Sequence, residues 1–169
     1  NFGIVYGISA FSLAQDIGVS VAEAKEYMER YFDTYRGVKR YMEQVVETAR
    51  EMGYVETLMH RRRALPELKS SNFNMRSFGE RVALNMPIQG TAADIMKLAM
   101  VRVEQRLQAE GLAAKLIMQV HDELIVECPE EERETVQRLL EEEMSGVVRL
   151  SVPLPAQAHS GKTWLEAKG

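Results

Sequence analysis

Cysteine is almost absent from this chain of 169 residues, which contains only Cys128. A disulfide within the chain is therefore excluded, and a reducing, cytoplasmic setting is the natural expectation. Long apolar runs are missing as well, since no stretch approaches the roughly 20 residues that a membrane-spanning helix requires. No signal peptide opens the sequence, and its first residue is Asn1 rather than Met, so we expect a fragment of a longer protein.

An excess of basic charge is also lacking, because the formal net charge is −4. Taken alone, this balance argues against a nucleic-acid partner. The charges are unevenly distributed, however: glutamates dominate residues 130–143, whereas residues 60–81 carry six basic and two acidic side chains. One face can thus be basic while the whole is acidic, and composition leaves the partner open. With 46% hydrophobic and 27% charged residues, the composition is that of a globular protein.

The first part of the chain has the periodicity of helices. Ser20 and Glu23 form a capping box in front of a helix, which Gly37 is predicted to break. Apolar residues at helical spacing then predict a second helix that ends at Gly53 and lies antiparallel to the first. We expect a short strand over residues 54–58 to follow, and after it a basic, irregular loop.

Further along, the periodicity changes from helical to strand-like. Helical spacing begins at residues 75–85, is predicted to be interrupted or bent by Pro87, and then resumes. Two apolar runs, residues 115–120 and 124–127, predict an antiparallel hairpin, and residues 151–158 predict a third strand at its edge. The predicted fold class is therefore α+β, mainly helical at first and then a small antiparallel sheet covered by helices.

The connection between the two predicted hairpin strands is His121-Asp122-Glu123. Tight hairpin turns favour Asn-Gly or Asp-Gly, whereas this one has no glycine and places like charges side by side. Carboxylates on rigid strands suit Mg²⁺, which takes one or two protein carboxylates together with water and substrate phosphates. A polar turn with solvated charges is the alternative, and these three residues do not decide between the two.

Arg81, Asn85 and Gln89 follow one another at intervals of four residues and share one helical face if the helix is not strongly bent. Their side chains offer donors to the minor-groove acceptors that A·T and T·A pairs have in common. Such contacts would test base-pair geometry without selecting a sequence. The alternative is an ordinary polar helix face, in which Thr91 and Asp94 form a capping box.

Two other segments have aromatic or basic side chains that could contact nucleic acid. Phe2 and Tyr6 lie in the opening Asn-Phe-Gly-Ile-Val-Tyr-Gly segment, where aromatic rings can stack on bases or form a buried turn. The consecutive residues Arg61, Arg62 and Arg63 can contact phosphates or simply form a solvated turn.

These four motifs occur in the same order in family A (polymerase-I-like) DNA polymerases, and together they span residues 1 to about 165. Gln-Val-His-Asp-Glu-Leu at residues 119–124 resembles the catalytic palm hairpin of that family. The resemblance implies that Asp122 binds two catalytic Mg²⁺ ions, that Glu123 lies beside them, and that His121 lies near the primer end.

The resemblance also implies roles for the other motifs. The helix face of Arg81, Asn85 and Gln89 would lie against the minor groove of the primer–template. In the opening segment, Phe2 would pack near the nucleotide sugar and Tyr6 beside the templating base. The arginines at 61–63 would contact phosphates, although the family often has an aromatic residue where Ala64 stands.

The resemblance predicts a division into a fingers portion, residues 1–74, and a partial palm, residues 75–169. It predicts a DNA-directed DNA polymerase acting in replication and repair, with primer–template DNA and deoxynucleoside triphosphates as partners and Mg²⁺ as cofactor. The setting would be the cytoplasm of a bacterial or phage-infected cell.

The resemblance also indicates what the chain lacks. The family's other metal-binding aspartate and its triphosphate-binding arginine and lysine lie upstream of the motifs found here. We therefore expect the fragment to be inactive alone and to need the missing N-terminal part of the same polymerase. One alternative is a non-catalytic remnant that binds DNA. Another is a metal-dependent nuclease or phosphohydrolase at Asp122 and Glu123, which would need further ligands.

Overall fold

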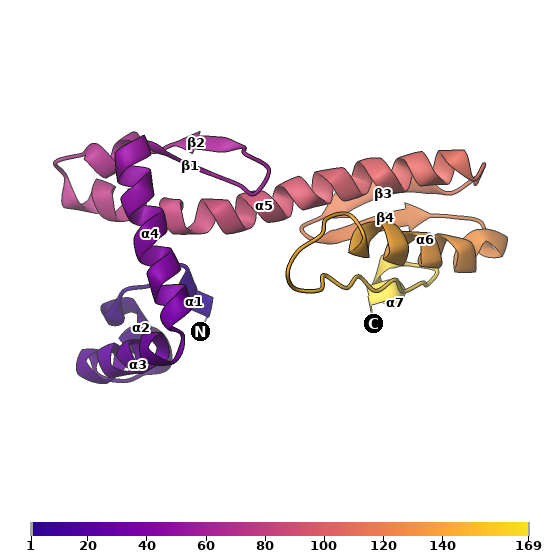
Figure 1. Cartoon of the computed structure of the whole chain (residues 1–169). Helices are drawn as coiled ribbons and strands as arrows, with labels where there is room; N and C mark the ends of the chain where they lie inside the picture. The colour runs from indigo at the N-terminus through magenta and orange to yellow at the C-terminus, as the bar shows by residue number, and fades with distance from the viewer. Residues whose placement is uncertain (1, 169) are drawn as a thin grey trace. The chain divides into compact units, whose positions relative to one another are not determined.

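The computed structural model describes residues 2–168, with the exception of the Phe2 side chain. It consists of helices and two antiparallel sheets of two strands each, which confirms the predicted α+β class (Figure 1). The chain divides into two compact units, residues 1–91 and 92–169, each with its own apolar core, and the division falls within helix α5 (Phe73–Ala109). No helix in the described residues has the length and apolar character needed to cross a membrane.

The first unit is mainly helical and contains one hairpin. Its elements are α1 (Phe2–Val5), α2 (Ala10–Ile17), α3 (Val21–Thr34), α4 (Arg36–Met52), β1 (Tyr54–Glu56), β2 (Arg62–Ala64), the 3-10 helix η1 (Pro66–Lys69) and the first part of α5.

The predicted capping box at the start of α3 is confirmed. The Ser20 hydroxyl accepts the N–H of Glu23 at 3.2 Å, and the Glu23 carboxylate accepts the N–H of Ser20 at 2.9 Å. The predicted break at Gly37 is wrong, because α3 and α4 are separated by Tyr35, whose backbone leaves the helical region with φ −108° and ψ 59°. Gly53 ends α4 as predicted, in the left-handed conformation.

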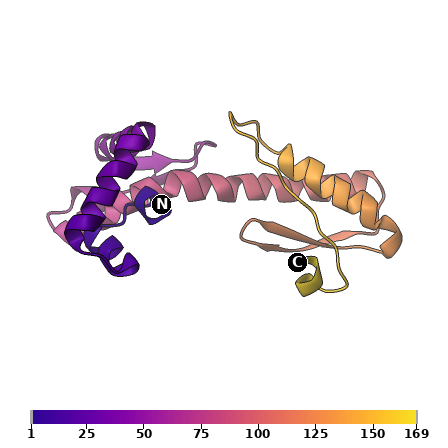
Figure 2. The same ribbon diagram turned by 90° about the horizontal axis from the view of Figure 1, so that it is seen from below.

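The predicted antiparallel pairing of α3 with α4 is also wrong. A connection of one residue is too short to reverse the chain direction between neighbouring helices. Helix α3 packs against α2 instead, and α4 leads away from it (Figures 1 and 2).

Strand β2 occupies part of the segment that was predicted to be an irregular basic loop. It pairs antiparallel with β1, so that Glu56 lies opposite Arg62 and Val55 opposite Arg63. The prediction failed because the exposed strand β2 is fixed by its pairing with β1 rather than by its own composition. The pairing places Val55 in the core of the first unit together with Ala49, Leu65, Leu68 and Ala83.

Helix α5 continues without interruption through Pro87, where a break or bend was predicted. A proline inside a helix removes one N–H donor and crowds the carbonyl of the residue four positions before it. Packing on both sides of Pro87 outweighs that loss, because Ala83 and Leu84 are buried before it and Ala99 and Val103 after it.

The second unit contains the other hairpin and its covering helices. Its elements are the remainder of α5, β3 (Lys115–Val120), β4 (Glu123–Glu127), the 3-10 helix η2 (Glu130–Glu132), α6 (Arg133–Ser145) and α7 (Trp164–Lys168). Strands β3 and β4 form the predicted antiparallel hairpin, which extends beside α5 and α6 (Figure 2). The core of the second unit consists of Val103, Leu107, Ala114, Val136 and Leu139.

The predicted third strand over residues 151–158 is not formed, and this segment is irregular. Pro153 and Pro155 have no N–H groups to offer a neighbouring strand. The N–H of Ala156 donates instead to the hydroxyl of Ser145 in α6, at 2.8 Å. Side-chain acceptors of α6 therefore replace the ladder that a third strand would need.

Leu107 provides a test of the core of the second unit, because only 2% of it is exposed. We expect Leu107→Ala to lower the free energy of unfolding by about 2–5 kcal/mol, because apolar packing is removed and a cavity remains. Urea denaturation followed by circular dichroism measures the change. Leu165→Ala is the control, because Leu165 is 85% exposed and its removal should change stability by less than about 0.5 kcal/mol. Equal effects of the two substitutions would contradict the assigned core.

Candidate functional site

The turn of the β3–β4 hairpin carries the predicted catalytic residues. Val120 pairs with Glu123, so His121 and Asp122 alone connect the strands. Two-residue hairpin turns need a residue with positive φ, which is usually glycine or asparagine. Here His121 takes that place, in the left-handed conformation with φ 52°. The side-chain amide of Gln119 donates to the His121 carbonyl at 2.7 Å and fixes the turn. Asp122 and Glu123 are thereby held next to one another at the end of a rigid hairpin.

The two carboxylates of this turn differ in their surroundings. Asp122 is exposed, and within residues 2–168 no hydrogen bond or ion pair engages its side chain. Glu123 is half-buried, and its carboxylate lies 3.9 Å from the ammonium group of Lys168 in α7. Two oxygen donors of this kind fit Mg²⁺, which completes its octahedral shell with water and phosphate oxygens. Among the described residues, no three His, Cys, Asp or Glu side chains gather to form a fuller metal site.

The face predicted to read the minor groove is intact because α5 does not break at Pro87. Arg81 and Gln89 are exposed, and neither side chain has a hydrogen-bond or ion-pair partner within the described part of the chain. Asn85 lies between them and is half-buried; its side-chain oxygen is buried and accepts no hydrogen bond there. Donors at Arg81 and Gln89 therefore remain available to a ligand.

The opening segment packs against this same face. A Cβ atom placed on Gly7 would lie 3.1 Å from a methyl group of Leu84 and 3.5 Å from Cγ of Arg81. Gly7 thus allows the turn after α1 to approach α5 closely, and Tyr6, which precedes it, is half-buried. The structure brings the Tyr6–Gly7 turn next to Arg81. The Phe2 side chain lies outside the described residues.

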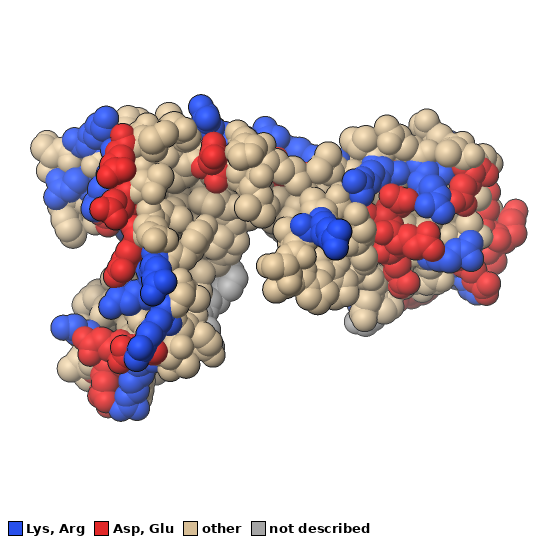
Figure 3. Space-filling model, in the orientation of Figure 1, with Lys and Arg blue, Asp and Glu red and all other residues tan. Residues whose placement is uncertain are grey.

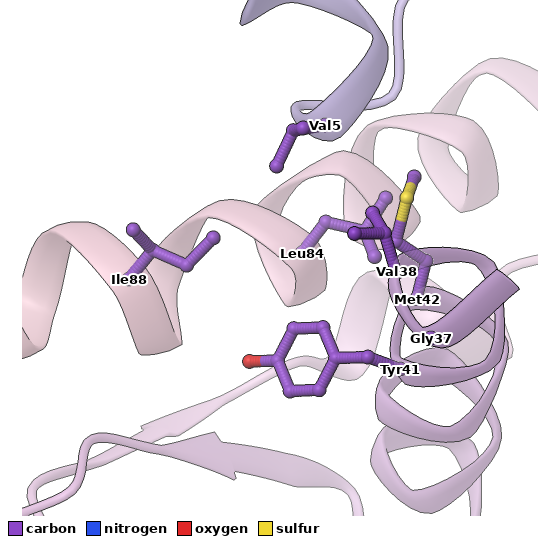
Figure 4. Close-up of a pocket in the computed structure, with 7 residues that line it drawn as sticks. All are labelled: Val5, Gly37, Val38, Tyr41, Met42, Leu84 and Ile88. Carbon is purple, nitrogen blue, oxygen red and sulfur yellow. The ribbon is translucent and has the colours of Figure 1, made fainter. Parts of the chain in front are cut away.

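An apolar cavity of about 270 Å³ lies beside this contact, in the first unit. Figure 4 shows its lining residues on α1, α4 and α5: Val5, Gly37, Val38, Tyr41, Met42, Leu84 and Ile88. The Tyr41 hydroxyl is the one polar side-chain group among them, and burial raises the pKa of Tyr41. A space lined in this way offers no charge or donor set for a nucleotide, and we assign it to packing.

The arginines of the first hairpin have different surroundings. The Arg62 guanidinium lies 4.6 Å from the ring centre of Tyr54, and its Nε donates to the Glu56 carboxylate at 3.3 Å. His60 contacts the other oxygen of Glu56, also at 3.3 Å. These hydrogen bonds, from His60 and then from Arg62, hold the pKa of Glu56 below its usual value. Arg63 is exposed and has no such partner in the described residues.

Acidic side chains gather over the second unit, around α6 (Figure 3). Some of them are structural: Glu132 accepts the N–H groups of Ala113 and Ala114 at 2.8 and 2.9 Å, and Glu143 pairs with Arg106 at 2.8 Å. The negative net charge therefore comes from acidic side chains of the second unit, and it does not argue against a nucleic-acid partner for the first unit.

Sequence reasoning missed two threonines with a structural role. Thr91 does not form the predicted capping box with Asp94, because it lies inside α5 and its hydroxyl bonds to the hairpin segment at Leu58. Thr57 is 3% exposed and accepts hydrogen bonds within the same turn. For Thr91 the available signal was a polar residue among the buried positions of a helix; Thr57, in a turn, had no such signal.

Two adjacent carboxylates, unpaired donors on a helix face and a basic hairpin are features that suit a protein that handles nucleic acid with a divalent cation. Residues 1–166 match the family model described as DNA polymerase family A. The chain belongs to this family. The resemblance expected from the motifs is confirmed.

Several relatives are similar over nearly the whole chain. DNA polymerase I of Bacillus caldotenax is 56% identical over 168 residues, which are 99% of this chain and 19% of that protein. DNA polymerase I of Bacillus subtilis is 52% identical over the same shares. The chain thus spans about a fifth of the length of these relatives.

A solved structure is also similar. It is described as the POL domain of Pol1 from M. smegmatis in complex with DNA primer-template and dNTP. The two are 46% identical with a TM-score of 0.96, and the match covers 99% of this chain and 30% of that one.

The ion pairs around Glu56 can be tested by titration. We expect Arg62→Ala and His60→Gly each to raise the pKa of Glu56, because each removes a donor to its carboxylate; glycine also tolerates the φ of 62° at position 60. Because folding lowers the pKa of Glu56, its ionised carboxylate stabilises the folded state. This stabilisation is fully present above the usual glutamate pKa and is lost as the pH falls through the lowered pKa. Side-chain carboxyl NMR measures the pKa, with Arg40→Ala as control. An unchanged pKa in both variants would refute these contacts.

Proposed function

We propose that the protein is a DNA-directed DNA polymerase that transfers nucleotides to a primer 3′-hydroxyl, acting in replication and repair. The observation that carries the proposal is the pair of adjacent carboxylates, Asp122 and Glu123, at the turn of an antiparallel hairpin in a family A chain. The relative described as bound to DNA primer-template and dNTP supports the same partners for this protein.

In this proposal Asp122 holds the metal ions and Glu123 lies beside them. Magnesium, when bound, would activate the primer hydroxyl and stabilise the charge that develops on the transferred phosphoryl group. Asp122 is suited to this role because its carboxylate is exposed and unpaired in the described residues. Glu123 has the Lys168 ammonium group nearby, which partly offsets the repulsion between the two carboxylates. His121, at the same turn, would contact the primer end.

The donors of the first unit would bind the DNA. Arg81, Asn85 and Gln89 would contact minor-groove acceptors, which report base-pair geometry independently of sequence. Phe2 and Tyr6 would contact the nucleotide sugar and the templating base. The hairpin residues Arg61, Arg62 and Arg63 would contact phosphates and give a salt-dependent affinity.

The two portions of the chain would correspond to the fingers, residues 1–74, and part of the palm, residues 75–169. The compact units of the fold meet at residues 91 and 92, within α5, and not at residues 74 and 75. Helix α5 would begin at the end of the fingers portion and continue through the palm, and it would carry the DNA-reading face. The assignment to fingers and palm remains a prediction.

We predict that the 169-residue polypeptide does not extend a primer by itself. Phosphoryl transfer depends on positioning and charge stabilisation, and the described residues hold two adjacent carboxylates but no cluster of three metal-ligand side chains. The measurement is extension of a labelled primer with Mg²⁺ and all four nucleotides. Metal-dependent extension by a preparation shown to be free of host polymerase would contradict this prediction.

The role of Asp122 can be tested in a chimera. The matching segment of the B. caldotenax polymerase is replaced by this chain, and we expect an active enzyme. Asp122→Asn should lower its extension rate about a thousandfold or more, because the metal loses a charged ligand. Asp16→Asn, at an exposed position of α2, is the matched control.

The same chimera distinguishes the alternative functions. A chimera that binds DNA tightly and yet does not extend the primer would favour a non-catalytic DNA-binding remnant. An active chimera that tolerates Asp122→Asn would overturn the assignment of the metal ligand. A nuclease at this hairpin has less support, because the described residues supply no further cluster of metal ligands.

A further inference from the structure

The turn between β1 and β2, residues 57–61, has a hydrogen-bond acceptor for each of its backbone N–H groups. Within the turn, the N–H of Thr57 donates to the carbonyl of Arg61 and the N–H of His60 to the carbonyl of Thr57, both at 3.0 Å. The remaining three N–H groups, those of Leu58, Met59 and Arg61, donate to threonine hydroxyls. The shape of this turn therefore depends on two side chains.

The Thr57 hydroxyl accepts two of these three N–H groups from inside the turn. They are the N–H groups of Met59 and Arg61, both at 3.2 Å, and only 3% of Thr57 is exposed. Because both bonds use the same oxygen, they fix the rotamer of Thr57 and with it the position of its methyl group.

Thr91, in helix α5, supplies the acceptor for the third N–H group. Its hydroxyl accepts the N–H of Leu58 at 3.0 Å and donates to the carbonyl of Pro87, one turn earlier in the helix. Thr91 is 8% exposed, so water cannot easily take over the bond. This bond ties the turn to α5 through the polypeptide backbone.

Gly90 makes the close approach possible. A Cβ atom at position 90 would lie 2.8 Å from the Thr57 methyl group, closer than nonbonded carbon atoms approach. The methyl group cannot rotate away without breaking the two bonds of the Thr57 hydroxyl. A side chain at position 90 would therefore push the turn away from α5.

We propose that Thr57, Gly90 and Thr91 form a hydroxyl clamp that positions the arginine hairpin for binding the DNA backbone. The clamp joins Arg61–Arg63 to the helix that carries Arg81 and Gln89, so that phosphate contacts and minor-groove contacts of the first unit keep a fixed spacing. These are positioning residues, because they act through the arginines. The inference rests on the proposed function, since it assumes that this surface binds DNA.

The test compares Thr91→Val with Thr91→Ser in the complete 169-residue chain. Valine keeps the branched shape and removes the acceptor for Leu58, whereas the Pro87 carbonyl retains its helical partner. Serine keeps the hydroxyl and should restore wild-type behaviour. Thr34→Val is the matched control, because the Thr34 hydroxyl makes a similar bond to the carbonyl of Arg30 but accepts none from another element.

Binding is measured by fluorescence anisotropy with a labelled primer–template duplex over a range of salt concentrations. For Thr91→Val we expect a weaker affinity, by about eightfold at about 0.1 M salt for each phosphate that the arginines no longer reach, and a salt slope lower by about 0.9 for each such phosphate. Gly90→Ala should act in the same direction. A change that only reduced the folded fraction would leave the slope unchanged.

Amide hydrogen exchange at Leu58 reports the clamp without DNA. It should accelerate in Thr91→Val but not in Thr91→Ser or Thr34→Val. If the wild-type chain binds DNA and Thr91→Val binds with the same affinity and slope, the positioning role is wrong. If Leu58 exchange is unchanged, the clamp itself is wrong. If the wild-type chain does not bind the duplex at all, the proposed function fails, and the positioning role with it.

Discussion

Continuity of helix α5 through Pro87 is the constraint on which the remaining structure depends. Before the proline, Ala83 closes the core against the β1–β2 hairpin, and after it Val103 and Leu107 form the core beneath β3–β4. The helix keeps its course because this burial outweighs a single lost backbone bond. A break at Pro87 would also rotate Gln89 away from the helix face that carries Arg81, so that the side-chain donors of the two residues would no longer lie on one face.

The two candidate binding features are supported in different ways. The Asp122–Glu123 turn is held by strand pairing and by the Gln119 amide, so its carboxylates are fixed although solvent reaches them. The arginine hairpin is held by threonine hydroxyls that reach its backbone from within the turn and from α5. In both, side chains that would contact a ligand are placed by neighbours that would not contact it.

Local signals in the sequence predicted some elements correctly. The Ser20 capping box and the β3–β4 hairpin were predicted correctly, because each is specified by residues close together in the chain. The break at Gly37, the irregular basic loop and the strand over residues 151–158 were predicted wrongly. For the basic loop and for residues 151–158 the outcome depended on partners elsewhere, namely strand β1 and the Ser145 hydroxyl that accepts the Ala156 N–H. The helix break fell instead at Tyr35, two residues before Gly37.

The sequence by itself determined the family, because its motifs are contiguous runs whose order along the chain can be read directly. It also determined which carboxylates share the hairpin turn, since Asp122 and Glu123 are neighbours in the sequence. Only the tertiary structure decided that Thr91 supports a backbone N–H at Leu58, 33 residues earlier, and that Gly90 leaves room for Thr57. Contacts between residues so far apart depend on how the hairpin packs on α5, and no local pattern in the sequence specifies that packing.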